Sequence, residues 1–161
     1  MAITRLGGAN AITGTIPTSV APGKGKVLQV VQGSFGSDFT TSSTTLQDSG
    51  LSVSITPTST SNKIYVSFQG SAYKDNTSTG SSGVRGNIKN DTSSTNLWSS
   101  DVVFEEDRSG AKSVNWTGMT ITDTPNSTSQ QTYKLLIRSN ISGQNARING
   151  PCFMYATEVE E

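Results

Sequence analysis

The clearest pattern in the chain is an alternation of apolar and polar residues over 51–56 and 63–69. A period of two predicts β-strands with one buried face and one solvated face. Residues 57–62 separate the two runs and contain a proline with Ser, Thr and Asn, which favour turns. We therefore predict that the two strands pair with each other as a β-hairpin. Its buried residues would be Leu51, Val53, Ile55, Ile64, Val66 and Phe68.

Shorter extended segments recur along the rest of the chain, separated by Gly, Pro, Asn and Ser, and no segment has helical periodicity. Residues 27–31 alternate little, which predicts a strand covered on both faces. Residues 71–83 are rich in Gly, Ser and Asn, and predict a long exposed loop. About eight to ten short strands with turn signals between them are typical of a β-sandwich or barrel. The other predicted strands are 84–89, 114–123, 132–139, 146–149 and 152–159.

The first 25 residues differ from the rest of the chain. Glycines and prolines interrupt every periodic pattern there, yet Ile3, Leu6, Ile12 and Ile16 are too apolar for a solvated linker. A frayed terminus is the alternative interpretation. We predict an extended N-terminal attachment arm over residues 1–25 and a β-sandwich domain over residues 26–161.

The amino-acid composition limits the kinds of partner that the protein is expected to bind. Of 161 residues, 32% are hydrophobic and 15% are charged, and the formal net charge is +0. A balanced charge predicts no binding to nucleic acid or to anionic membranes. The sequence has no run of about 18 apolar residues and no secretory signal. We therefore expect that the protein does not insert into a membrane and that it is assembled in a cytoplasm. Cys152 is the only cysteine, which excludes an intrachain disulfide, and we expect it to be buried.

Catalytic chemistry has few residues available. The chain has no histidine, which excludes Ser-His-Asp and Cys-His catalysis and histidine-ligated metal sites. Glu105, Glu106 and Asp107 are the densest acids, and they are the place to look for a carboxylate pair or a calcium site. Neighbouring strand residues point to opposite faces, the spaced Asp/Asn-Gly calcium loop is missing, and such a cluster is typical of a solvated loop. We predict no enzymatic activity, no cofactor and no metal.

Two aromatic residues in polar surroundings are candidates for ligand contact. Tyr73 falls in the predicted 71–83 loop, and Trp98 follows a turn. Carbohydrates and proteins often stack on exposed rings. A Trp in a small β domain is more often part of the core, which is the alternative for Trp98.

The segments KVLQVVQ, GLSVSITPTSTSNKIYVSFQG, VRGNIKND, TITDTPNSTSQQTYKLLIRS and FMYATEVE occur in this order over about residues 26–159. This succession resembles the small β-jelly-roll modules of marine and cyanobacterial tailed phages, and AITRLGGANAITGTIP resembles the leaders that attach such modules to virions. The resemblance implies an all-β, antiparallel jelly-roll-like sandwich with an extended N-terminal arm.

The same resemblance implies a homotrimeric, non-enzymatic virion protein, either a head decoration or a fibre or knob appendage. Its expected partners are copies of itself and capsid, portal, tail or fibre proteins, and its expected location is the virion, assembled in the host cytoplasm. Ile3, Leu6, Ile12 and Ile16 would anchor it. The alternative is a tail-fibre module that recognises a glycan of the host surface, with Tyr73 and Trp98 as contacts.

Overall fold

The computed structural model describes residues 25–75, 82–98, 100–107 and 113–161. Within these residues the chain forms ten β-strands and no helix. The strands are β1 (Val27–Phe35), β2 (Phe39–Thr41), β3 (Gln47–Ile55), β4 (Lys63–Asp75), β5 (Ser82–Asn90), β6 (Thr95–Asn96), β7 (Val102–Asp107), β8 (Ser113–Asp123), β9 (Gln131–Ser139) and β10 (Asn145–Val159).

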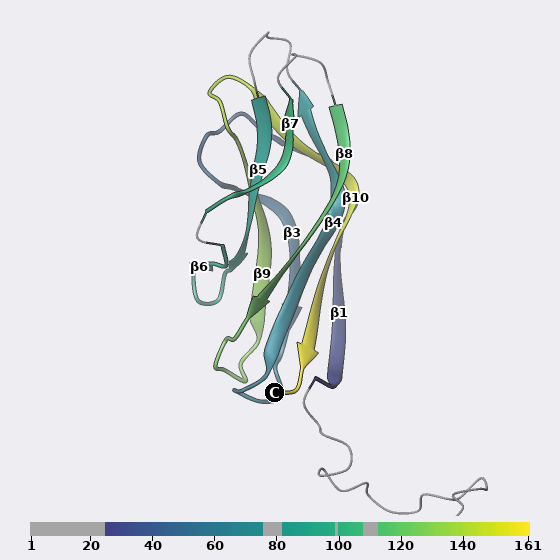
Figure 1. Cartoon of the computed structure of the whole chain (residues 1–161), viewed down its shortest axis with the longest axis vertical. Helices are drawn as coiled ribbons and strands as arrows, with labels where there is room; N and C mark the ends of the chain where they lie inside the picture. Colours follow the sequence, from purple (N-terminus) through teal and green to yellow (C-terminus); the bar gives the residue numbers. More distant parts are fainter. Residues whose placement is uncertain (1–24, 76–81, 99, 108–112) are drawn as a thin grey trace, which may run out of the picture.

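The strands form two five-stranded antiparallel sheets (Figure 1). Sheet A has the order β1-β10-β4-β8, with β2 also paired to β10, and sheet B has the order β3-β9-β5-β6, with β7 paired to β5. The pairs are nested: β1 with β10, β3 with β9, β4 with β8, and β5 with β7. This nesting is the strand order of a jelly roll, so the predicted fold class is confirmed.

The core lies between the two sheets and is built from the inward residues of each alternation. Leu51, Val53 and Ile55 of sheet B face the sandwich interior, as do Ile64, Val66 and Phe68 of sheet A. Complete burial of such a side chain contributes about 1.5–3 kcal/mol. The single cysteine, Cys152, is buried in this core, as the sequence predicted.

The predicted hairpin over residues 51–69 is wrong, although both of its strands are present. β3 pairs with β9 in sheet B, whereas β4 pairs with β10 and β8 in sheet A. Residues 56–62 therefore form an arch that crosses from one sheet to the other, with Pro57 and Asn62 buried in it. The alternation is the same for a hairpin and an arch, because both bury one face of each strand.

The prediction that residues 27–31 are covered on both faces is also wrong. β1 is an edge strand of sheet A, with 54% of Val27 and 59% of Val30 exposed. The register with β10 shifts between Val27 and Gln29, which marks a β-bulge. At the bulge, the alternation of inward and outward side chains shifts by one residue. The apolar run therefore reflects an irregular edge strand and not a strand buried on both faces.

The predicted loop over residues 71–83 is wrong at both of its ends, which lie in strands. β4 continues through Asp75 and β5 begins at Ser82, so Tyr73 lies in a strand, and residues 76–81 lie outside the described part of the chain. Residues 71–74 pair with both β10 and β8. Pairing on two sides outweighs the weak strand propensity of this segment. The break expected at Gly150 and Pro151 is instead a register shift within one long strand, β10.

Candidate functional site

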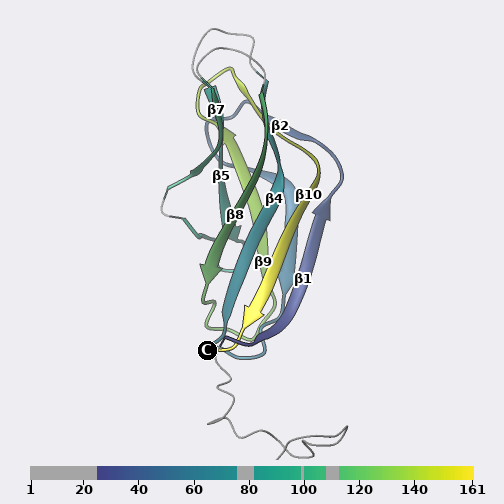
Figure 2. The ribbon, with the colours of Figure 1, turned by 45° about the vertical axis from the view of Figure 1, so that its right-hand side comes forward.

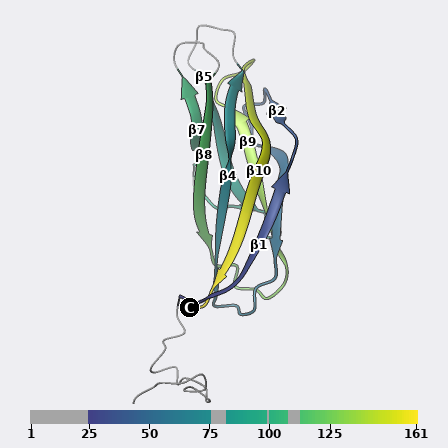
Figure 3. The ribbon, with the colours of Figure 1, turned by 90° about the vertical axis from the view of Figure 1, so that its right-hand side faces the viewer.

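The outward side chains of sheet A form one continuous surface. β10 turns Met154 and Ala156 inward, so Phe153, Tyr155 and Thr157 lie on the outer side. The strand registers align them with outward residues of β1, β4 and β8 in three rows. Figure 3 shows these strands side by side in sheet A. We call this surface the sheet A face. Its rows are Val30, Thr157, Tyr65 and Thr122; Gln32, Tyr155, Ser67 and Thr120; and Ser34, Phe153, Gln69 and Gly118.

No member of the sheet A face carries a charge. Hydroxyl and amide groups surround three aromatic rings, and Thr120 Oγ1 donates to Ser67 Oγ at 3.2 Å. Tyr155 pairs with Ser67 and Tyr65 pairs with Thr157, so the two tyrosines are diagonal neighbours. Diagonal residues lie about 7–8 Å apart, within reach of aromatic side chains. The face therefore has an aromatic centre and neutral polar surroundings.

The outer side of sheet B has the opposite character. Lys134 Nζ lies 3.1 Å from Asp48 Oδ2 and 3.0 Å from Asp91 Oδ2, and Lys89 Nζ lies 3.0 Å from Asp91 Oδ1. Hydrogen bonds from Lys134 and Lys89 lower the pKa of Asp91 below its ordinary value. These groups are partly exposed to solvent, so the ion pairs contribute little to stability. Ion pairs thus lie on the outer side of sheet B, and on sheet A they occur beyond the three rows, at Lys63 and at Arg147.

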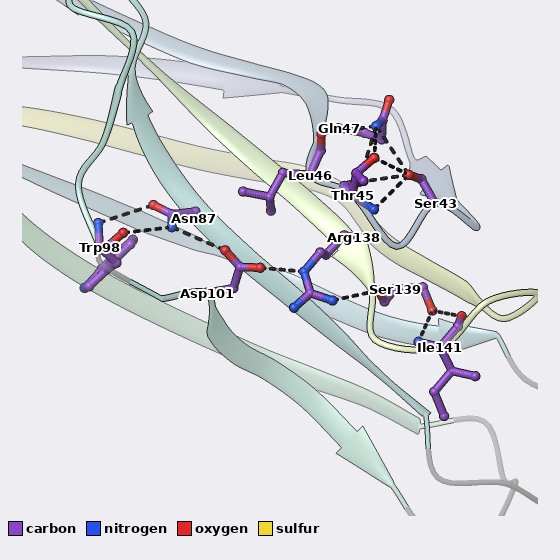
Figure 4. A network of polar contacts seen from close by, with 10 residues as sticks. All are labelled: Ser43, Thr45, Leu46, Gln47, Asn87, Trp98, Asp101, Arg138, Ser139 and Ile141. Atoms are coloured by element: carbon purple, nitrogen blue, oxygen red, sulfur yellow. Dashed lines mark hydrogen bonds and ion pairs between the residues drawn. The ribbon is translucent and has the colours of Figure 1, made fainter.

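Trp98 belongs to a polar network on sheet B (Figure 4). Asn87 Nδ2 donates to the Trp98 carbonyl at 3.3 Å, and Trp98 N–H donates to Asn87 Oδ1 at 3.4 Å. Asn87 Nδ2 also lies 3.4 Å from Asp101 Oδ1, and Arg138 Nε donates to Asp101 Oδ2. The Trp98 side chain is partly buried against the core. This network fastens the segment before β7 onto β5 and β9.

Tyr73, the second predicted contact residue, is not brought together with Trp98, because it lies on β4 in sheet A. It pairs with Arg147 of β10, whose guanidinium carbon is 5.7 Å from the centre of the Tyr73 ring. Arg147 also donates to Asp38, as does the Gly150 N–H at 3.0 Å. The hydrogen bond from Arg147 lowers the pKa of Asp38. Tyr73 lies near the carboxyl end of β4. Figure 2 shows that β4 runs away from the C-terminus of the chain, so the cluster lies towards the opposite end of the sandwich.

The predicted anchoring residues, Ile3, Leu6, Ile12 and Ile16, lie outside the described residues. The acidic segment is a strand and not the expected loop: Glu105, Glu106 and Asp107 end β7, opposite Val84, Gly83 and Ser82 of β5. No group of three or more Cys, Asp or Glu residues that could hold a metal ion occurs in the described ranges. The same ranges contain no helix long and apolar enough to cross a membrane.

The end of the domain where the chain enters is fixed by Glu158, which sequence reasoning missed. The Gly25 N–H donates to the Glu160 carbonyl at 2.7 Å, and the Glu160 N–H donates to the Lys26 carbonyl at 2.9 Å. Beside this ladder, the fully buried Glu158 accepts hydrogen bonds from two side-chain amides, one backbone N–H and one hydroxyl. The donors are Gln29 Nε2 at 2.6 Å, Thr58 N at 2.6 Å, Thr58 Oγ1 at 2.8 Å and Asn62 Nδ2 at 2.7 Å.

The Glu158 network sets the charge state of its carboxyl. Burial raises the pKa, but the hydrogen bonds from Asn62, Gln29 and Thr58 outweigh burial and lower the pKa to about 2. Glu158 is therefore ionised at neutral pH and ties the 56–62 arch to β1 and β10. The sequence held a signal for this residue, because Glu158 follows Cys152, Met154 and Ala156 at a period of two and so falls on the inward face.

No family model and no curated protein matches the chain. Among solved structures, the T13 IBDV viral particle has 15% identity and a TM-score of 0.42 over 81% of this chain and 35% of that one. The structure of the infectious bursal disease virus Gt strain is 14% identical to this chain, with a TM-score of 0.40, over 86% of this chain and 39% of that chain. The infectious bursal disease virus VP2 subviral particle has 15% identity and a TM-score of 0.39, with 81% and 37% covered.

The chain thus spans less than two fifths of the length of these virus proteins. At TM-scores below 0.5, the assignment of the fold depends on the strand order of the chain itself.

Proposed function

We propose that the protein is a non-enzymatic structural component of a bacteriophage virion, a homotrimeric head decoration or fibre or knob appendage held by its N-terminal arm. The observation that carries the proposal is the arrangement of the domain. A jelly roll presents a neutral aromatic face along sheet A, and the chain enters it at one end beside Glu160. Jelly rolls are common in viral capsid proteins, and the sequence resemblance to phage modules adds the phage virion.

The arm is proposed as the anchor because of its composition. Ile3, Leu6, Ile12 and Ile16 are separated by glycines, which let an extended backbone follow another protein closely. Burial of each aliphatic side chain contributes about 1.5–3 kcal/mol before the cost of ordering the arm. In a trimer, the attachment of one arm raises the effective concentration of the other two at the particle. Attachment through this segment leaves the opposite end of the domain free.

Recognition of a host-surface glycan is a second candidate, favoured by the Tyr73 cluster at that free end. An aromatic ring beside Arg147 and Asp38 combines a stacking surface with charged hydrogen-bonding groups. However, Arg147 already covers part of the ring. A glycan array with the wild type and Tyr73→Ala tests this candidate, and tight binding that is lost in the variant would give it preference over a purely structural role.

Deletion of residues 2–17 tests the anchoring. The shortened protein should fold and form trimers like the full chain, as measured by circular dichroism and light scattering, because the sandwich starts at β1. It should be missing from purified particles. A shortened protein that copurifies with particles at full occupancy would place the attachment site on the β domain.

A further inference from the structure

The sheet A face combines aromatic rings with neutral polar groups. Twelve aligned positions on four strands carry no charge, while the outer side of sheet B holds interlinked ion pairs. Tyr65 is 37% exposed and Val30 is 59% exposed, and the half-buried Phe153 and Tyr155 lie between β1 and β4. Protein interfaces are enriched in aromatic residues and depleted in Lys, Glu and Asp at their centres. This surface has that composition.

The edge next to this face has little of the usual protection. Edge strands normally carry a Lys, a Pro, an inward charge or a β-bulge that prevents pairing with other chains. From Val27 to Phe35, β1 has no Lys, Pro or charge, and its only protective feature is the bulge between Val27 and Gln29. Beyond the bulge, this edge adjoins the face at Val30, Gln32 and Ser34. Face and edge therefore form one continuous uncharged surface.

We propose that this surface is the contact between copies of the chain, with a second copy covering the sheet A face. The inference deepens the proposed function and rests on its trimer. The polar groups of the face are hydroxyls and amides, each of which both donates and accepts hydrogen bonds, so the face can pair with the equally neutral β1 edge of a second copy. A charged partner would leave its own charges unpaired there. A threefold ring needs two different patches on each copy, and the face and the adjoining β1 edge supply them.

Single lysine substitutions in the full chain test the contact. Tyr155→Lys places a charge at the centre of the face, and Tyr65→Lys repeats the test on β4. Thr95→Lys is the matched control, because Thr95 is an exposed residue of β6, at the edge of sheet B away from β3. At about 10 µM, light scattering should show three chains for the wild type and Thr95→Lys, and one chain for both tyrosine variants. Interfaces of standard size have dissociation constants from about micromolar to picomolar, so a specific trimer is assembled at this concentration.

Circular dichroism of each variant should show the wild-type strand spectrum, which separates loss of contact from loss of fold. Tyrosine variants that remain trimeric while Thr95→Lys dissociates would move the contact to sheet B. A monomer produced by deletion of residues 2–17 alone would make the arm the occupant of the face. Tyrosine variants that stay trimeric but lose binding to a neutral glycan would make a glycan the occupant. A monomeric wild type would overturn both this contact and the trimer. The anchoring is tested separately, by whether the protein without residues 2–17 is missing from particles.

Discussion

Glu158 shows how one side chain can hold several elements of a sandwich together. Its carboxylate is fully buried and receives donors from Gln29 of β1 and from Thr58 and Asn62 of the 56–62 arch. A buried carboxylate without partners would be strongly destabilising, but each of its oxygens accepts at least one hydrogen bond here. The residue therefore fixes the end of the domain at which Gly25 pairs with Glu160.

Glu158→Gln is expected to lower the free energy of unfolding by about 2 kcal/mol at neutral pH, because charge-assisted hydrogen bonds are lost and the new amide faces other donors. The effect should depend on pH. The folded carboxyl has a pKa of about 2, below its ordinary value, so the unfolded state binds more protons at acidic pH. The stabilisation is complete above about pH 4.5 and is lost as the pH falls towards 2.

Urea unfolding of the wild type and Glu158→Gln at neutral pH and at several acidic values measures this difference. The gap between the two proteins should shrink as the pH falls, because the wild-type carboxyl becomes protonated. Other carboxylates titrate in the same range, but they are common to both proteins and cancel in the comparison. A gap that stays constant down to about pH 2.5 would contradict the ionised state assigned to Glu158.

At the scale of elements, β1 approaches β3 closely at Gly33, where the two sheets meet at one edge of the sandwich. A Cβ atom on Gly33 would lie 1.9 Å from the carbonyl oxygen of Ser52, a backbone atom that cannot move alone. Gly33→Ala is therefore expected to force the strands apart and to lower the free energy of unfolding by about 1–3 kcal/mol. Gly36→Ala is the control, because its Cβ would meet nothing within 4 Å.

Thermal unfolding of both alanine variants checks this prediction. Gly36→Ala should change the unfolding free energy by less than about 0.5 kcal/mol, as is usual for surface substitutions. Equal stability of the two variants would show that the edge of the sandwich is more open than the contact between Gly33 and Ser52 indicates.

The sequence was sufficient to locate most strands but not to pair them. Alternation over 51–56 and 63–69 identified β3 and β4, because the inward face of each strand is apolar whichever sheet it joins. Their partners, β9 and β10, are far away in the sequence, and no local pattern specifies such pairing. The prediction for β1 was wrong for a related reason. The bulge interrupts the two-residue period of β1, and the bulge can be recognised only from the pairing of β1 with β10.

The candidate surface was harder to predict than the fold. Tyr65, Phe153 and Tyr155 belong to different strands, and only the register of β10 with β4 gathers them. The two-residue period of each strand predicts that these side chains point outward. Which of them become neighbours depends on how the strands pair in the sheet. Tyr73 and Trp98 stood out because their local contexts are polar, yet one lies beside Arg147 and the other against the core.

For the whole molecule, the division between a neutral sheet A face and a charged sheet B predicts how assembly responds to salt. Raising NaCl from about 0.1 M to about 1 M shortens the Debye length from about 10 Å to about 3 Å, which weakens contacts between charges. The trimer fraction measured by light scattering should stay unchanged over this range, because no ion pair is expected in the contact. Dissociation with increasing salt would point to the ion pairs of Lys134 and Lys89 as the interface.

The nested strand order also governs how the protein is made on the ribosome. β1 is among the first parts of the domain to be synthesised, and its partner β10 is the last, with Val27 opposite Val159. At a translation rate of roughly 5–20 residues per second, β1 waits on the order of ten seconds for its partner. During that time an apolar, uncharged strand is exposed on every nascent chain of a polysome. Neighbouring ribosomes on one message would then hold several such strands close together, which favours association of copies from the same message before they diffuse apart.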